Sequence, residues 1–393
     1  MTETETDTTV VARLVQDISE LPAAQWDACA GTDNPFVSHA FLSALEDSGS
    51  VCRERGWGPV HVVMTADDGS LRACAPLYLK SHSRGEYIFD YGWADAYERA
   101  GGRYYPKLLS AVPFTPVTGP RLLVPPGPGQ ERVRRELVAA LVAASEQLDI
   151  ATVNINFLPE EDTALLEEYD FLHRTDQQFH WYNRGYACFD DFLGDLSSRK
   201  RKTIRRERRG ALDSDIAIEV LTGDDLTEAH WDAFFAFYMD TGGRKWGTPY
   251  LNRRFFSLIN ERMRDKIVLI MCRRAGRYIA GALNFVGSDA IYGRHWGCIE
   301  DHRFLHFEAC YYRAIDFAIE HGLDRVEAGA QGPHKLARGY LPTLIHSAHH
   351  IRHEGFRRAV ADFLRHERRE VAQDAAYLAD RTPFRRGEHA SLE

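Results

Sequence analysis

The sequence predicts a mixed α/β (α+β) protein made of two like domains, each with a mixed central sheet flanked by helices. The chain has 393 residues, which is enough for two or three domains of ordinary size. Hydrophobic residues make up 44% of it and charged residues 27%, as is typical of globular proteins with sizeable cores. The order strand, tight turn, strand, strand, helix, strand occurs twice, about 200 residues apart, and such repetition favours two domains of one architecture.

Composition and charge argue against several classes of protein. The net charge of −9 does not fit a protein that coats nucleic acid over its whole surface, although it allows a local basic patch. No stretch approaches the roughly 18 consecutive apolar residues of a membrane span. Residues 1–11 begin acidic and threonine-rich, so we expect a disordered tail and no secretion signal. The seven scattered cysteines contain no C-x-x-C pair, which indicates reduced thiols and a cytoplasmic protein.

The first copy of the repeated order starts with a β-hairpin. Apolar runs at 61–65 and 71–80 flank Asp67, Asp68 and Gly69, and an Asp-Gly pair supplies the positive φ that a tight hairpin turn needs. The other elements expected in this copy are a third strand at 86–91, a helix at 131–148, a strand at 151–158 and a short helix at 160–169.

The second copy follows the same order with clearer signals. Its strands are expected at 267–271, 278–286, 290–297 and 325–330, with a turn at 273–277 and a helix at 307–321. Gly322 is the natural residue to end that helix. The expected organisation is a tail at 1–11, domains at 12–188 and 189–380, and a tail at 381–393, with the boundary near 186–192.

A basic segment lies between the two copies. Residues 199–209 contain eight basic residues and one acidic one, and Ser197 or Ser198 can cap them as a helix. A second helix is expected at 222–239. The basic helix has two interpretations. It captures a polyanion such as a tRNA acceptor stem, or it is an inter-domain helix whose charges pair with the acidic remainder of the protein.

Two polar runs carry a family resemblance. Residues 240–247 and 329–342 resemble those of the Fem-like predicted N-acyltransferases, and the resemblance covers about residues 12–375. The two-domain order with a basic helix entering the second domain is similar to the Fem aminoacyl transferases. These have tandem acetyltransferase-type (GNAT) domains and add amino acids from aminoacyl-tRNA to peptidoglycan precursors.

The resemblance implies two tandem GNAT-like domains and an N-acyltransferase that has no permanently bound cofactor. Its co-substrate is aminoacyl-tRNA or acyl-CoA, and its acceptor is a small-molecule or peptide amine. The basic helix then meets donor phosphates through Lys202 and Arg205. GNAT-type folds stabilise the developing oxyanion with backbone N–H groups at splayed strands. The Gly-rich acyl-CoA turn of that fold is replaced here by 297–306, which favours aminoacyl-tRNA or another activated acyl group over acetyl-CoA.

The candidate catalytic residues lie at two expected strand ends. His295 ends the third strand of the second copy beside Trp296, and a histidine suits general-base work. The alternative is a structural histidine. The polar, glycine-flanked loop at 331–340 supplies Gln331 and Lys335 as further catalytic candidates and His334, Arg338 and Tyr340 as substrate ligands. The alternative there is an ordinary solvated loop.

Further substrate ligands come from two other segments. Arg244, Trp246 and Tyr250 lie in or next to a loop expected at 241–249, and an arginine beside a tryptophan suits recognition of a planar anion or base. The alternative is a loop anchored by a buried tryptophan. His346 and His349 alternate along an expected strand and line the site. No standard metal set is completed by these histidines, or by His302 with His306, so no metal is expected.

Two functions therefore remain open. The first is direct attack of an amine on an activated acyl or aminoacyl donor in a ternary complex, since no cysteine lies in a nucleophile motif. The second is a non-catalytic GNAT-like module that binds RNA or a small ligand, in which the Gly-poor turn marks lost catalysis.

Overall fold

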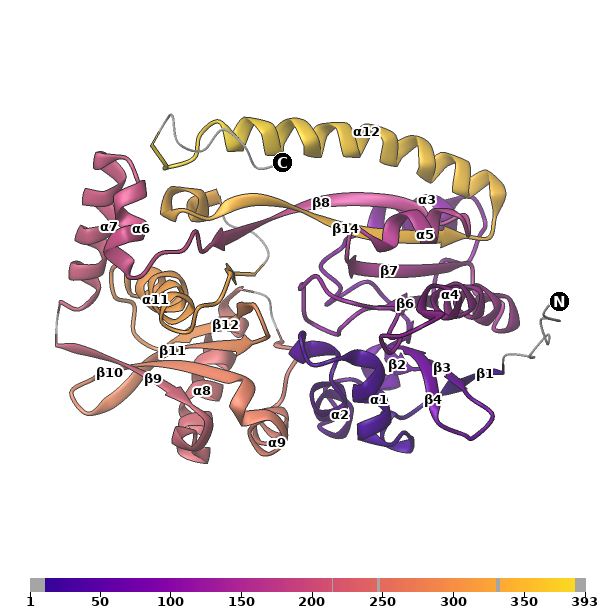
Figure 1. Ribbon diagram of the computed structural model, residues 1–393, viewed down its shortest axis with the longest axis horizontal. Coiled ribbons are helices and arrows are strands. Elements are labelled where there is room, and N and C mark those ends of the chain that lie inside the picture. The colour runs from indigo at the N-terminus through magenta and orange to yellow at the C-terminus, as the bar shows by residue number, and fades with distance from the viewer. Residues whose placement is uncertain (1–10, 214, 246–247, 330–332, 386–393) are drawn as a thin grey trace.

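The computed structural model describes residues 11–385, apart from 214, 246–247 and 330–332. The expected tails at 1–11 and 381–393 fall largely outside this range. We call residues 11–188 the N-terminal half and 189–385 the C-terminal half. The described chain is a mixed α/β structure with helices on both faces of a large mixed sheet, which confirms the predicted class (Figure 1).

Two sheets organise the chain. The smaller contains β1 (Ala12–Val15), β3 (His61–Thr65) and β4 (Leu71–Ala75), and it includes the predicted hairpin. The larger has 11 strands in the order β2 (Trp57–Pro59), β5 (Tyr78–Lys80), β6 (Lys107–Ser110), β7 (Thr152–Leu158), β14 (Leu341–Ile351), β8 (Leu172–Tyr182), β13 (Arg325–Glu327), β12 (Ala290–Cys298), β11 (Arg277–Val286), β10 (Ile267–Arg274) and β9 (Ile216–Thr222).

The two halves exchange strands within the larger sheet. β14, the last strand of the C-terminal half, lies between β7 and β8 of the N-terminal half. In return, β8 pairs with β13 of the C-terminal half, with Tyr182 opposite Arg325. The sheet therefore runs without a break across the boundary expected at 186–192, and the limits of the two domains stay a prediction.

Each half contains a parallel strand pair, which is the structural counterpart of the repeated order. β6 runs parallel to β7, and α4 (Gln130–Gln147) connects them. β12 runs parallel to β13, and the connection contains α10 (Leu305–Phe307), a π-helical turn η6 (Glu308–Tyr312) and α11 (Arg313–Glu320). The helices expected at 131–148 and 307–321 are thus confirmed. Gly322, with φ of 64°, follows the second one.

Two expected elements are wrong. The strand at 86–91 is an irregular segment that leads into α3 (Tyr91–Arg99). The buried ammonium of Lys107 binds the carboxylates of Glu86 and Asp90, which turns these side chains inward from an irregular loop. The loop at 241–249 is also shorter than expected, because α8 (Glu228–Lys245) continues through its first half, and this helix starts later than the expected 222.

Helices cover the C-terminal part of the sheet on both faces. On one face, α8 and α9 (Arg253–Met263) share a hydrophobic core with α1 (Ala23–Ala30) and α2 (His39–Asp47), so one core spans both halves. On the other face lie α6 (Phe189–Asp195), α7 (Ser198–Ala211) and α11.

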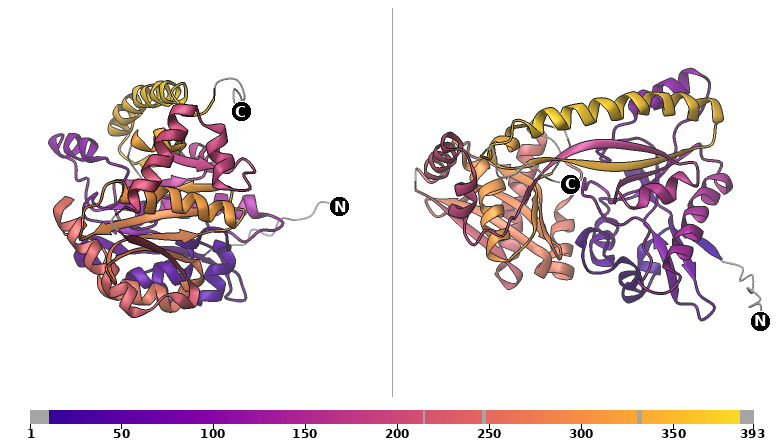
Figure 2. Two further views of the ribbon diagram at one scale, coloured as in Figure 1. Left: turned by 90° about the vertical axis from the view of Figure 1, so that its left-hand side faces the viewer. Right: turned by 45° about the horizontal axis from the view of Figure 1, so that its top comes forward.

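The remaining helices complete the layers. α5 (Asp162–Glu167) contacts β8 and β14. α12 (Glu354–Ala379) lies along the exchanged strands β8 and β14 and extends from one half to the other (Figure 2). None of the helices in the described part of the chain has the length and apolar character needed to cross a bilayer.

Candidate functional site

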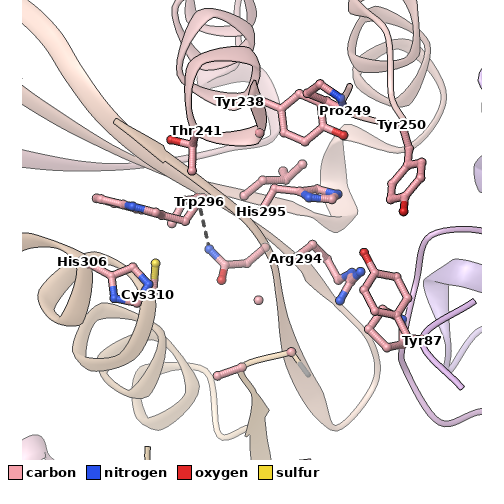
Figure 3. A pocket seen from close by; sticks show the side chains of 18 of the residues that line it. Tyr87, Tyr238, Thr241, Pro249, Tyr250, Arg294, His295, Trp296, His306 and Cys310 are labelled. Carbon is pink, nitrogen blue, oxygen red and sulfur yellow. Dashed lines mark hydrogen bonds between the residues drawn. The ribbon is translucent and has the colours of Figure 1, made fainter. Parts of the chain in front are cut away.

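A cavity of about 410 Å³ lies where β12 and β13 diverge (Figure 3). The two strands pair only from Ala290 to Tyr292 and from Arg325 to Glu327, and then they separate. Gly293 and Gly329 line the cavity just beyond the last pair. A Cβ atom placed on Gly329 would lie 3.5 Å from the carbonyl oxygen of Gly293, so the gap is narrow at its closed end.

An extra residue in β12 shapes the open part of the gap. Leu283 of β11 lies opposite His295, whereas the next residue, Asn284, lies opposite Gly293. Arg294 is therefore the additional residue of a β-bulge. A bulge leaves its extra residue outside the regular ladder and re-aims the neighbouring side chains. This local change brings both Arg294 and His295 to the cavity.

The cavity is lined from both faces of the sheet. His295 contacts Tyr238 of α8, with ring centroids 5.1 Å apart. The next residue, Trp296, contacts His306 of α10 on the opposite face, at 5.3 Å. Figure 3 shows Tyr238 and His306 on opposite sides of the strands. All four of these residues line the cavity, so it passes through the sheet at the gap between β12 and β13.

The N-terminal half supplies one wall of the cavity. Tyr87 and Phe89 line it from the irregular segment before α3. Tyr87 has a φ of 63°, and a bulky side chain in the left-handed region is an uncommon backbone state that the surrounding structure must hold in place. Nη2 of Arg294 donates a hydrogen bond of 2.8 Å to the carbonyl oxygen of Phe114. The cavity therefore lies between the two halves, and residues of both halves line it.

Burial sets the charge state of two groups in the bulge. It lowers the pKa of His295 to about 3, with a further contribution from the neighbouring Arg294. His295 is therefore neutral at physiological pH and a weak proton acceptor. Burial also lowers the pKa of Arg294, which still stays charged because an arginine starts so high.

The described part of the polar segment at 331–340 lies next to the cavity and contacts cavity residues through its side chains. This part contains η7 (Pro333–Arg338). Lys335 is buried, and its Nζ donates a hydrogen bond of 2.7 Å to the carbonyl oxygen of the cavity residue Gly329. Burial lowers the pKa of Lys335 to about 8. His334 lies 2.9 Å, Nε2 to OH, from the cavity residue Tyr311.

Several predicted ligands lie elsewhere. Arg338 pairs with the buried carboxylate of Glu207 at 2.8 Å, and Tyr340 is buried in the core below it. Arg244 pairs with Asp240 at 2.6 Å and donates to the carbonyl oxygen of Cys298 near the end of β12. None of these three arginine and tyrosine residues lines the cavity.

The two predicted histidine ligands of β14 lie in a different part of the sheet. His346 contacts His173 at 2.9 Å, Nδ1 to Nε2, and Nδ1 of His349 contacts Oδ1 of Asn154 at 2.7 Å. Neither lines the cavity. Of the other predicted residues, Tyr250 does line it, whereas Trp246 and Gln331 lie outside the described residues. The described residues contain no cluster of three or more histidine, cysteine or acidic side chains suited to a metal ion.

The basic helix α7 packs beside the cavity with one face and exposes the other. It contacts α10, η6 and η7, through buried residues that include Ile204 and Glu207. Arg208 pairs inward with Glu308 at 3.0 Å. Of the two predicted donor ligands, Arg205 is exposed and pairs with Asp190 at 2.9 Å, and Lys202 is exposed.

Sequence reasoning missed most of the cavity. The missed residues are Tyr87, Tyr238, Asn284, Gly293, Arg294 and His306. A usable signal existed for Arg294, which directly precedes His295 and is a charged residue inside an otherwise uncharged strand. There was no such signal for Tyr87, because it approaches the site from a segment that was expected to be a strand.

Comparisons with known proteins give the family and the fold of the chain. A family model described as FemAB-like, peptidoglycan biosynthesis and recognition, matches residues 17–386. A search of curated protein sequences finds no match. Among solved structures, that of FemX is similar, with a TM-score of 0.55, 12% identity, and coverage of 87% of this chain and 98% of that chain.

A second similar structure is the C-terminal domain of a putative lysylphosphatidylglycerol synthetase from Agrobacterium fabrum, with a TM-score of 0.53, 10% identity, and coverage of 86% of this chain and 96% of that chain. Identities this low establish a shared fold alone. The fold class expected from the sequence, a Fem-like mixed α/β structure with a mixed sheet flanked by helices, is confirmed. Family and fold together support acyl or aminoacyl transfer in general. Because the family model matches nearly the whole chain, the protein belongs to the FemAB-like family.

Proposed function

We propose that the chain transfers an acyl or aminoacyl group from an activated donor to an amine inside the cavity at the β12–β13 gap. One observation supports this most directly. The cavity passes through the sheet, so a donor that enters on the α10 face and an acceptor that enters on the α8 face can meet at Gly293 and Arg294. Direct attack in a ternary complex requires the two substrates to be held together in the right orientation, and it does not require a nucleophilic side chain.

The chemistry uses the bulge and the gap. The amine nitrogen attacks the carbonyl carbon of the donor, and the bond from that carbon to the ester oxygen or thioester sulfur then breaks. A bulge frees backbone N–H groups from the ladder, and such groups can stabilise the developing oxyanion. The attacking amine gives its proton to an imidazole that lines the cavity, and the leaving oxygen or sulfur takes up a proton. We assign proton acceptance to His306, because the pKa of about 3 makes His295 a weak base.

The α10 face favours aminoacyl-tRNA over acyl-CoA as the donor. The exposed side of α7 carries Lys202, Arg206 and Arg209 beside the elements that line this face. By contrast, the arginines that reach the turn between β12 and α10 are already paired with a carboxylate of that turn, so they are not available to an approaching pyrophosphate. The side chain of Glu300 there pairs with Arg274 at 2.7 Å and with Arg277 at 2.6 Å. A polyanion that spreads along α7 fits these charges better than a pyrophosphate in the turn.

The test is a transfer assay with a matched pair of variants. The purified chain is incubated with charged tRNA or with a set of acyl-CoA thioesters, together with amine acceptors that include peptidoglycan precursors, and products are detected by mass spectrometry. Gly293→Leu fills the gap, whereas Gly293→Ala fits, because a Cβ atom there meets nothing closer than 3.4 Å. We expect product with the wild type and the alanine variant, and a large loss with the leucine variant at unchanged thermal stability.

Other outcomes separate the alternatives. Product from acyl-CoA but not from charged tRNA would reverse the donor assignment. Binding of tRNA or of an amine without product from any donor would favour the non-catalytic binding module. Equal product from the leucine and alanine variants would remove the gap from the reaction.

A further inference from the structure

Arg294 presents an unbalanced positive charge to the cavity. Its side chain lines the cavity and faces Tyr87 across the boundary between the halves (Figure 3). A guanidinium has five N–H donors. Among the described residues, the one hydrogen-bond acceptor of this side chain is the carbonyl oxygen of Phe114, 2.8 Å from Nη2. One N–H therefore anchors the side chain and the others remain for a ligand.

The described part of the cavity wall holds no carboxylate that could balance this charge. Its polar side chains are hydroxyl, amide, thiol, imidazole and indole groups, and Arg294 is the one residue with a permanent charge. The nearby carboxylate of Glu327 acts on Arg294 only through space, where it partly offsets the lowering of the guanidinium pKa by burial, and its direct partner is Arg325, with Oε1 2.9 Å from Nε. Arg294 is half-buried, and a charge withdrawn from water is usually paired, because an unpaired one loses hydration without compensation.

The position of Arg294 indicates which substrate it serves. Its anchor, Phe114, belongs to the N-terminal half and packs in the hydrophobic core that includes α8, and its neighbour Tyr87 comes from the same half. The basic helix α7 packs on the sheet face opposite α8, beside α10 and η6. A polyanionic donor held by α7 therefore approaches from the far side, and Arg294 is left for the acceptor.

We propose that the amine acceptor carries an anionic group, a carboxylate or a phosphate, that pairs with the guanidinium of Arg294 inside the cavity. A planar fork of N–H donors fits either anion through two parallel hydrogen bonds. Tyr87 and Tyr250 flank this position and suit an apolar or planar portion of the same molecule. The proposal rests on the proposed function, because it treats the cavity as the place where an amine accepts an acyl group.

The first test uses the wild-type chain and three probes of matched shape, 4-(aminomethyl)benzoate, its carboxamide and the corresponding arylphosphonate. Each probe is added before phenylglyoxal, and modification of the peptide that contains Arg294 is followed by mass spectrometry. We expect the anionic probes to slow modification of Arg294 at least about tenfold more than the amide. The exposed Arg365 serves as the internal control and should react equally in all samples. Preference for the carboxylate or the phosphonate identifies the anion.

The second test measures transfer to the same probes. Arg294→Gln should erase the preference for the anionic amines, and Arg294→Lys should keep part of it. Thermal melting of both variants shows whether loss of the hydrogen bond to Phe114 has destabilised the fold. The protection experiment uses only the wild type, so it does not depend on how the variants fold. Protection without any transfer would support the anion site and count against the proposed function. Transfer to neutral and anionic amines at equal rates, or equal protection by all three probes, would overturn the anion site and leave the proposed function standing.

Discussion

The Nζ atom of Lys335 lies 2.7 Å from the carbonyl oxygen of Gly329, and the bond is shielded because only 2% of Lys335 is exposed. Gly329 follows β13 at one edge of the gap, with a φ of 75°. Lys335 comes from η7, six positions later in the chain. The bond therefore closes a short loop and holds one edge of the cavity in place.

Replacing this lysine should impair transfer more than folding. Lys335→Met keeps the length of the side chain and removes the donor to Gly329. A hydrogen bond from a charged group is worth about 1.5–3 kcal/mol, so we expect a loss of roughly 10- to 100-fold in kcat/KM. The control is Lys266→Met, at a part-exposed position in the turn before β10. Unchanged kcat/KM in Lys335→Met would show that the hydrogen bond from Lys335 to Gly329 has no part in the reaction.

The same lysine should give the protein a measurable pH dependence of stability. Its pKa is lowered from 10.5 to about 8, so between these values the unfolded chain binds a proton that the folded chain has lost. Unfolding then takes up protons, and the free energy of unfolding rises with pH through this window, by on the order of 3 kcal/mol. Urea unfolding at pH 7.5 and pH 10 should show this rise in the wild type and a smaller one in Lys335→Met. An equal rise in the free energy of unfolding of the two proteins would contradict the lowered pKa of Lys335.

Reversing charges on α7 should weaken tRNA binding. The variant Lys202→Glu/Arg206→Glu/Arg209→Glu changes three exposed side chains of the basic helix. If each meets a phosphate, the slope of log K against log salt concentration should fall by about 2–3. The control variant reverses Arg358, Arg365 and Arg369 on α12, an equal change in net charge on another surface. If the two variants weaken tRNA binding equally in a filter-binding assay, the affinity depends only on the net charge of the protein and not on α7.

Lys107 should be essential for the wall of the cavity that carries Tyr87. It is fully buried, binds Oε2 of Glu86 at 2.7 Å and also binds Asp90, on either side of that wall. Lys107→Met leaves Asp90 buried without this cation and leaves Glu86 with only the longer contact to Lys80, at 3.8 Å, so we expect a loss of about 3–5 kcal/mol in urea unfolding. Adding Glu86→Gln and Asp90→Asn should restore part of this stability. A loss below about 1 kcal/mol in the single variant would mean that the carboxylates are solvated.

The sequence predicted local elements well because their signals are local. The Asp-Gly hairpin, the helix at 131–148 and the strand that ends in His295 and Trp296 each depend on neighbouring residues. The segment at 86–91 failed for the opposite reason. Its Glu86 and Asp90 are held by Lys107, and no periodicity within the segment shows that a cation lies buried beneath it.

The candidate site was predicted in part for similar reasons. The spacing of His295, Trp296 and Lys335 along the chain placed them near strand ends, and the structure brings them to the gap or next to it. Arg338 has the same kind of sequence context, yet Glu207 neutralises it from 131 positions away. A pairing across that distance depends on how α7 packs against η7, and that packing is not visible in a linear pattern.

The exchange of β8 and β14 has a consequence for synthesis on the ribosome. β7 and β8 are complete when Tyr182 emerges, but β14 fills the space between them only after about 160 more residues have been translated, roughly 10–30 s later. During that time, the nascent chain carries two long strands with open edges, which are prone to pair wrongly. The halves therefore cannot mature one after the other or be inherited as separate genes without losing a strand. The two halves reach the native state as one folding unit.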